Sequence, residues 1–105
     1  MKIALSVKGV GLGAWLDDFM DCGHVMIVED NNQFQSWAND FEGTGDNASD
    51  QLCESIIQKA PDILITGRID QESQQKMEDE NIRVFSKESG FVLDLVEKFR
   101  DVSHH

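Results

Sequence analysis

The feature that most constrains the fold is an apolar run, DILITG at residues 62–67, that lies between two helical patterns. Pro61 precedes the run, and proline stops the helix before it. A strand that is apolar at nearly every position is typical of a sheet covered on both faces. The run therefore predicts an α/β fold with this strand in the interior.

The remaining elements follow from hydrophobic periodicity and turn residues. We expect strands at 2–7, 24–30, 33–39 and 81–86, and helices at 48–60, at about 70–80 and over the apolar face Phe91 to Phe99. Asn31 and Asn32 predict a hairpin turn, which makes the strands on either side antiparallel. Leu12, Trp15, Leu16 and Phe19 have helical spacing and predict one further short helix.

Together these elements give the order βββαβαβα and a mixed five-stranded sheet with one antiparallel strand, because strands joined by helices pair in parallel. In such sheets, ligands bind at the carboxyl ends of the parallel strands. The corresponding loops are KGVGLG at 8–13, GRID at 67–70 and SKES at 86–89. These loops are where we expect a site.

Length and charge limit the classes of function. A chain of 105 residues fits one domain, which we expect at 1–103; His104 and His105 are either native or the remnant of a purification tag. Nine Lys and Arg against twenty Asp and Glu give a net charge of −11. An acidic protein repels phosphate polyanions and anionic membranes, so we expect neither nucleic acid nor a membrane as partner.

Cysteine content and hydropathy predict a cytoplasmic protein. Cys22 and Cys53 are too few for a disulfide scaffold and match no zinc signature, so both are expected as reduced thiols. We place Cys53 in the core, beside the apolar stripe of its helix. The opening run MKIALSV is too short for a signal peptide, and no stretch approaches the roughly 18 apolar residues of a membrane span.

The segment DDFMDCGHVMIVED at residues 17–30 carries the candidate metal ligands. Cys22 and His24 alternate, and alternate residues of an extended chain share a face. A thiolate and an imidazole there suit iron, copper or molybdenum, with Met20 as a further ligand. The alternative is that Cys22 is a small buried residue and His24 a hydrogen-bonded side chain at a strand edge.

Two glycine turns are candidate anion sites. Gly43 and Gly45 lead into a helix N-terminus, whose free N–H groups bind anions; a tight turn with a cap is the alternative. Gly67 is followed by Arg68, the only cation at that turn, and a solvated surface arginine is the alternative. The glycines of the 8–13 loop lack the spacing of a dinucleotide fingerprint.

Four sequence blocks resemble, in order, the motifs of a known family. They are MKIALSV at 1–7, Phe19 with Cys22, GTGDNASDQL at 43–52 and ITGRIDQESQQKMEDENIRVF at 65–85. On these blocks the chain resembles the dinitrogenase iron–molybdenum cofactor biosynthesis superfamily, which includes small cofactor carriers and cluster-binding proteins of nitrogenase maturation. Asn81 stands where that family usually has glycine, and asparagine is well suited to a left-handed backbone.

The resemblance implies a ribonuclease H-like three-layer fold and a role related to nitrogen fixation. It implies binding, carrying or assisting assembly of an anionic iron–sulfur or iron–molybdenum cluster, with cluster-assembly or acceptor proteins as partners. The cluster-binding residues would be Cys22, Gly43, Gly45, Gly67 and Arg68, with Cys22 and His24 as metal ligands. The oligomeric state is left open, since edge strands permit dimerisation.

The chain departs from the family at its functional motif. Asp18 replaces a histidine, Met20 a glycine, Asp21 an arginine and Asp70 a glycine. Exchanging a cation for an aspartate opposes the binding of an anion, so a divergent interaction or regulatory module that has lost cluster binding is the alternative function. The acidic loop also suits a hard cation or a single copper ion.

No catalytic constellation is present in the sequence. Two-metal nucleases of the ribonuclease H-like class need a carboxylate on the first strand, and KIALSV has none. Nor is there a nucleophile elbow or a recognisable triad. We therefore expect a protein that is not an enzyme.

Overall fold

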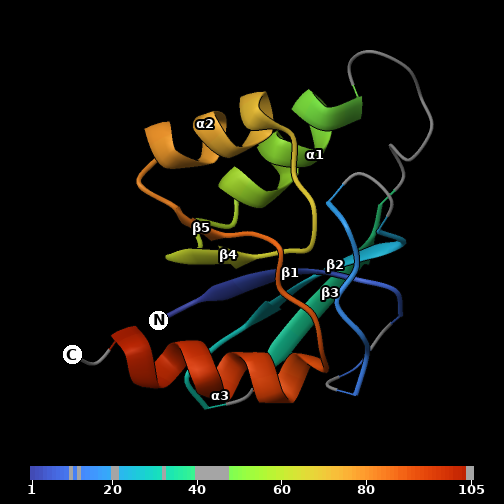
Figure 1. The fold of residues 1–105 in the computed structure, drawn as a ribbon, viewed down its shortest axis with the longest axis vertical. Helices are drawn as coiled ribbons and strands as arrows, with labels where there is room; N and C mark the ends of the chain where they lie inside the picture. Colours follow the sequence, from blue (N-terminus) through green and yellow to red (C-terminus); the bar gives the residue numbers. More distant parts are fainter. Residues whose placement is uncertain (10, 12, 20–21, 32, 40–47, 104–105) are drawn as a thin grey trace.

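Five strands form one sheet in the order β3-β2-β1-β4-β5 in the computed structural model of the chain (Figure 1). The structure describes residues 1–9, 11, 13–19, 22–31, 33–39 and 48–103, without the side chains of 48, 49 and 100–103. The strands are β1 (Ile3–Val7), β2 (His24–Val28), β3 (Phe34–Ala38), β4 (Ile63–Ile65) and β5 (Arg83–Phe85). The helices are α1 (Ala48–Ile57), α2 (Gln71–Asp79) and α3 (Val92–Ser103).

The strand directions make the sheet mixed. β1, β4 and β5 run parallel, whereas β2 is antiparallel to both of its neighbours, β1 and β3. The hairpin between β2 and β3 turns at Asn31, whose Oδ1 accepts a hydrogen bond from the Gln33 amide at 3.2 Å. The predicted α/β class and mixed five-stranded sheet are confirmed; Asn32, the other predicted turn residue, lies outside the described residues.

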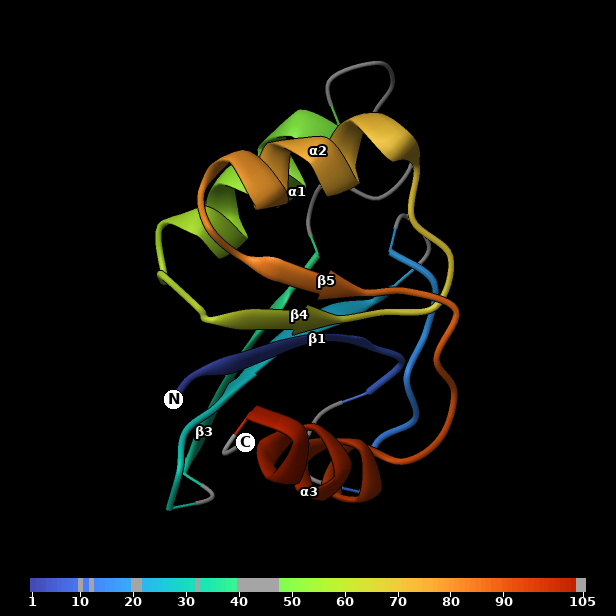
Figure 2. The same ribbon diagram turned by 60° about the vertical axis from the view of Figure 1, so that its left-hand side comes forward.

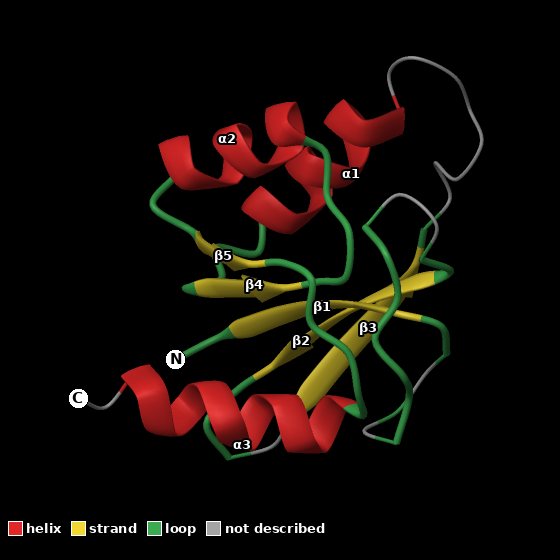
Figure 3. Cartoon of the chain, in the orientation of Figure 1, coloured by secondary structure: helices red, strands yellow, loops and turns green. Residues whose placement is uncertain are grey.

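Helices cover both faces of the sheet: α1 and α2 lie on one face and α3 on the other (Figures 2 and 3). We call the apolar cluster under α3 the α3-side core; it contains Ile3, Leu5, Val7, Leu16, Met26, Val28, Ile63, Ile65, Val92, Leu95, Val96 and Phe99. The α1/α2-side core contains Ala4, Phe19, Cys22, Val25, Ile27, Leu52, Cys53, Ile56, Leu64, Met77 and Ile82. Consecutive residues of β1 and β4 alternate between the two cores, which is why both strands read as continuous apolar runs.

The expected short helix over residues 12–19 is wrong for the part that the structure describes. Trp15 forms an isolated β-bridge with Phe91, and Leu16 forms one with Val7. Backbone hydrogen bonds from Leu16 N to the Gly90 carbonyl and from Val92 N to the Ala14 carbonyl hold this segment extended. Leu16 and Phe19 pack in opposite cores, so their helical spacing does not represent one helix face.

Local backbone chemistry sets the helix ends. α1 ends at Ile57 rather than at the expected Ala60, which has a positive φ of 52°. Ala60 precedes Pro61, and a residue before proline is disfavoured in the right-handed helical region. α2 begins after Asp70, whose carboxylate accepts a hydrogen bond from the Ser73 amide at 3.0 Å. Asn81 follows α2 with φ of 64°, which confirms the predicted left-handed backbone.

Among the described residues, none of the helices has both the length and the apolarity that crossing a bilayer requires.

Candidate functional site

The carboxyl ends of β1, β4 and β5 meet at one edge of the sheet, and the chain after β1 crosses this edge. We call this region the strand-end edge, defined by Ser6, Asp17, Asp18, Thr66, Gly67 and Arg68. Ser6 Oγ lies 2.6 Å from Thr66 Oγ1, and both residues are fully buried. Ser6 Oγ also donates to the Asp17 carbonyl at 2.7 Å, while the Asp17 amide donates to the Ser6 carbonyl at 2.8 Å. These contacts anchor residues 17–19, which we call the crossing segment, to the end of β1.

The crossing segment is also bonded to the turn after β4. Gly67 N donates to the Asp17 carbonyl at 3.1 Å, and Phe19 N donates to the Arg68 carbonyl at 2.8 Å. The Arg68 amide in turn donates to Asp18 Oδ1 at 2.8 Å. A Cβ on Gly67 would collide with Asp18 Oδ1 and would lie 3.3 Å from the Asp17 carbonyl oxygen. Glycine at 67 therefore permits the close approach that these hydrogen bonds require.

The loop after β5 also contacts the strand-end edge, through Thr66 and Gly67. Lys87 N donates to the Gly67 carbonyl at 2.7 Å, and Glu88 N donates to the Thr66 carbonyl at 3.2 Å. The Arg68 and Lys87 side chains are exposed, and neither forms an ion pair within the part of the chain that the structure describes. Two cationic side chains are thus available here beside two half-buried aspartates, Asp17 and Asp18.

The structure places Cys22 in the interior. Cys22 is fully buried in the α1/α2-side core, and its Sγ donates to the Phe19 carbonyl at 3.2 Å. Asn39 Nδ2 donates to the Cys22 carbonyl at 2.9 Å and lies 3.7 Å from Sγ. The thiol therefore lies behind the crossing segment, where its contacts match the alternative of a small buried residue.

The structure does not bring Cys22 and His24 together. His24 is the first residue of β2 and has the strand alternation of Met26 and Val28, which pack in the α3-side core. Cys22 precedes the strand and packs in the opposite core, because the chain at residues 22–23 is not extended strand. His24 Nδ1 is buried without a hydrogen-bond partner among the described residues. Met20, the third candidate ligand, lies outside the described residues.

The other predicted site residues divide into described and undescribed positions. Gly43 and Gly45 lie outside the described residues, whereas Gly67 and Arg68 are at the strand-end edge. Cys53 is fully buried in α1, as expected, and burial raises the pKa of its thiol. Across the described ranges, no group of three or more His, Cys, Asp and Glu side chains could hold a metal ion.

Asp18 is the residue whose role sequence reasoning missed. In the sequence, Asp18 stood out only because the resembling family has a histidine there, and not as the hydrogen-bond acceptor of the Arg68 amide. The buried Ser6 and Thr66 hydroxyl pair was missed as well. The sequence does contain a signal for this pair, because Ser6 and Thr66 are each a polar residue at the end of an otherwise apolar run.

The fold and the strand-end edge define a small α/β protein whose sheet carries helices on both faces. No protein-family model matches this chain, and no curated protein matches it. Solved structures do match. The apo form of the orange protein from Desulfovibrio gigas aligns with a TM-score of 0.88 and 20% identity, covering 95% of this chain and 87% of that one.

Two further structures have the same fold. A putative NifB protein from Thermotoga, described as belonging to the DUF35 family, aligns with a TM-score of 0.75 and 19% identity over 95% of this chain and 87% of that one. The protein PH0822 aligns with a TM-score of 0.78 and 18% identity over 94% and 88% of the two chains. At these identities the likeness establishes the fold.

Proposed function

We propose that the protein binds, carries or helps to assemble an anionic metal–sulfur cluster of iron–molybdenum type at the strand-end edge. The observation that supports this most is that two blocks of the family resemblance, far apart in the sequence, are hydrogen-bonded there, because Phe19 N donates to the Arg68 carbonyl. The likeness in fold to an orange protein solved in its apo form, and to a putative NifB protein, supports the same proposal.

The proposal includes a ribonuclease H-like classification of the fold and a cytoplasmic location. It also includes cluster-assembly or acceptor proteins as partners and no catalytic activity of the chain itself. The cluster is cargo in this proposal, so the chain has to attract, hold and release it.

The residues at the edge suit an anionic cargo held mainly by charge. The exposed Arg68 guanidinium and Lys87 ammonium supply cations, and the Arg68 amide becomes a donor to the cargo once Asp18 is displaced from it. Cys22 reaches the cargo as a ligand only after its thiol leaves the Phe19 carbonyl and the segment over it opens. His24, on the other side of the sheet, takes no part in this arrangement.

Anaerobic reconstitution with iron, molybdate and sulfide tests the proposal. We expect a visible charge-transfer band with matching metal and sulfide content, and its loss in Cys22→Ala. Arg68→Gln should lower the loading while leaving the thiol in place. Cys53→Ala is the matched control, because Cys53 is an equally buried thiol of the same core that belongs to α1 and not to the residues of the strand-end edge.

A colourless protein with the same metal content in every variant contradicts cluster binding. A band that Cys22→Ala and Arg68→Gln leave unchanged contradicts this location for it.

A divergent interaction module is the second candidate, and one contact favours it. The Asp18 carboxylate already accepts the hydrogen bond of the Arg68 amide, which is a donor that an anionic cargo would use. If the module has lost cluster binding, a partner captured from cell extract is retained equally by wild type and Cys22→Ala, and metal analysis is negative for both.

A further inference from the structure

β3 lies at one edge of the sheet, with β2 as its neighbour on the inner side. The hydrogen bonds to β2 show which backbone groups of β3 are used. Glu29 N donates to the Gln33 carbonyl at 2.8 Å, and Asn39 N donates to the Gly23 carbonyl at 2.9 Å. In an antiparallel pair, residues that bond to the neighbouring strand alternate with residues that do not. The odd-numbered residues of β3 therefore bond to β2.

The even-numbered residues of β3 are Phe34, Ser36 and Ala38, and their N–H and C=O groups point away from β2. Among the described residues, none of these outward groups has a hydrogen-bond partner. A line of free donors and acceptors along an edge strand is a template for pairing with another strand.

β3 lacks the features that usually protect an edge strand, which are charged side chains, proline and bulges. Residues 33–39 read QFQSWAN, without charge or proline, although the chain as a whole has a net charge of −11. The register with β2 is continuous over all five residues of the strand, so β3 contains no bulge. β5, at the other edge, has only three residues and begins with Arg83. The edge at β3 is thus the one that is open to pairing.

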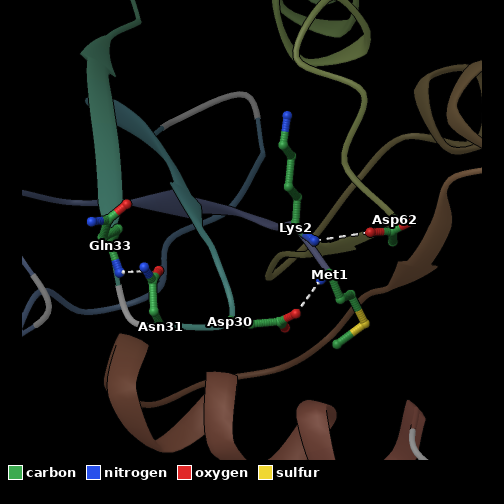
Figure 4. Close-up of polar contacts among 6 residues, drawn as sticks. All are labelled: Met1, Lys2, Asp30, Asn31, Gln33 and Asp62. Atoms are coloured by element: carbon green, nitrogen blue, oxygen red, sulfur yellow. Dashed lines mark hydrogen bonds and ion pairs between the residues drawn. The ribbon is translucent and has the colours of Figure 1, made fainter.

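Hydrogen bonds at both ends hold β3 in place. Before the strand, Asn31 Oδ1 accepts from the Gln33 amide at 3.2 Å, and Asp30 pairs with the amino terminus at 2.6 Å (Figure 4). After the strand, Asn39 Nδ2 donates to the Cys22 carbonyl at 2.9 Å. A strand that is already ordered loses little conformational freedom when another strand pairs with it.

We propose that the outer edge of β3 pairs with β3 of a second copy of this chain, antiparallel and centred on Ser36. The product is a symmetric dimer with one continuous sheet. In this register Ser36 faces Ser36 of the second copy, and Phe34 faces Ala38 of the second copy. Each facing pair exchanges two hydrogen bonds, so the outward groups of both strands are all satisfied.

The side chains of β3 also match those of a second copy in this register. Phe34, which is 43% exposed, lies opposite the small side chain of Ala38, on the face of the sheet that carries the α3-side core. On the other face Trp37 lies opposite Gln35, and no like charges meet across the pair. Two paired strands form a smaller contact than the roughly 1,200–2,000 Å² of stable complexes, so the dimer is weak and concentration-dependent.

Analytical ultracentrifugation and amide hydrogen exchange test the proposal in the full chain. We expect dimers at high protein concentration, and more of them with added salt, because salt screens the repulsion between two acidic copies. Raising the concentration should slow exchange at Phe34, Ser36 and Ala38. The amides of Gln35 and Trp37 bond to β2 in both states and should change little.

Substitutions at Ser36 locate the contact. Ser36→Pro removes the central outward N–H without removing a bond to β2, and should weaken dimerisation about tenfold or more. Ser36→Lys places like charges opposite each other and should weaken it as well. Gln51→Lys makes the same charge change on the exposed face of α1 and is the matched control, which should dimerise like wild type. The amide spectrum of each variant shows whether it is folded.

Two results overturn the proposal. A chain that stays monomeric at every concentration and salt does so, and leaves the open edge to a strand of a different protein. A dimer that both Ser36 substitutions leave unchanged, or that protects the amides of β3 without alternation, rules out this contact.

Discussion

Asp18 Oδ1 accepts a hydrogen bond from the Arg68 backbone amide at 2.8 Å, so a side chain of this protein acts as the anion at its own candidate anion site. The same carboxylate would collide with any Cβ on the adjacent Gly67. The two residues hold the crossing segment against the turn after β4. Any anionic cargo that uses this amide has to displace Asp18.

Asp18→Ala tests the strength of that contact. Removal of a charged acceptor leaves the Arg68 amide without its partner, and we expect a loss of about 1–2 kcal/mol in the free energy of unfolding. Asp18→Asn keeps an oxygen at the same position and should lose less than half of that. Urea denaturation measures both, with Glu54→Ala on the exposed face of α1 as a control that should change little. Equal losses in Asp18→Ala and Glu54→Ala contradict the prediction.

Asp18→Asn should also strengthen the loading of an anionic cargo. The substitution removes a negative charge beside Arg68 without removing an acceptor, so repulsion of the cargo falls. We expect more metal and sulfide per chain after the anaerobic reconstitution described above. Reduced loading in Asp18→Asn would show that the carboxylate serves the cargo instead of excluding it.

Gly67→Ala should destabilise the protein by about 2 kcal/mol, in the range measured for overpacked sites. The added methyl group collides with the Asp18 carboxylate and meets the Asp17 carbonyl oxygen and Asp18 Cα at 3.3 Å. Gly13→Ala is the matched control, since nothing lies within 4 Å of a Cβ there. Thermal or urea unfolding compares the two variants, and a neutral Gly67→Ala would refute the close packing.

Ala60→Gly should stabilise the protein by about 1 kcal/mol, because Ala60 has a left-handed φ of 52° that glycine adopts without steric cost. Ala38→Gly, in the edge strand β3, should have the opposite sign, since glycine weakens a strand. Urea unfolding measures both effects as shifts of the midpoint concentration at an unchanged m value. A destabilised Ala60→Gly would contradict the described end of α1.

The Cys53 thiol should make stability depend on alkaline pH. Burial raises the pKa of Cys53 above its ordinary value of 9.0, so the folded protein keeps the thiol protonated while the unfolded chain releases the proton at lower pH. This contribution is fully present below the unfolded pKa and is lost as pH rises through and beyond it. Unfolding free energies between about pH 8 and pH 10 should therefore fall more steeply in wild type than in Cys53→Ala. Parallel pH profiles would contradict the prediction.

The sequence predicted those parts of the fold that depend on local patterns. The apolar runs of β1 and β4 predicted buried strands, and the residues before Gln33 predicted the hairpin. Asn81 stands where the resembling family usually has glycine, and from that position and its residue type we expected a left-handed backbone; its φ is 64°. The segment around Trp15 and Leu16 was wrongly predicted as a helix. Its extended conformation depends on bridges from Trp15 to Phe91 and from Leu16 to Val7, and these partners cannot be recognised from the residues of the segment itself.

The candidate site was predicted less well, for a related reason. Alternation placed Cys22 and His24 on one face, but it applies only to extended backbone, and the strand begins at His24. The turn at Gly67 and Arg68 was correctly expected at the carboxyl end of β4. Its contact with Asp18 connects positions 50 residues apart, and no spacing rule reaches that far.

β1 is buried at all five positions, lies between β2 and β4, and contributes alternate residues to both cores. Amides in such a strand exchange with solvent only when the whole protein unfolds, so their exchange rates measure global stability. β1 also reaches Ser6 at the strand-end edge. A ligand at the strand-end edge that binds the folded state alone would slow exchange along this whole strand, which makes the β1 amides a reporter of occupancy at that edge.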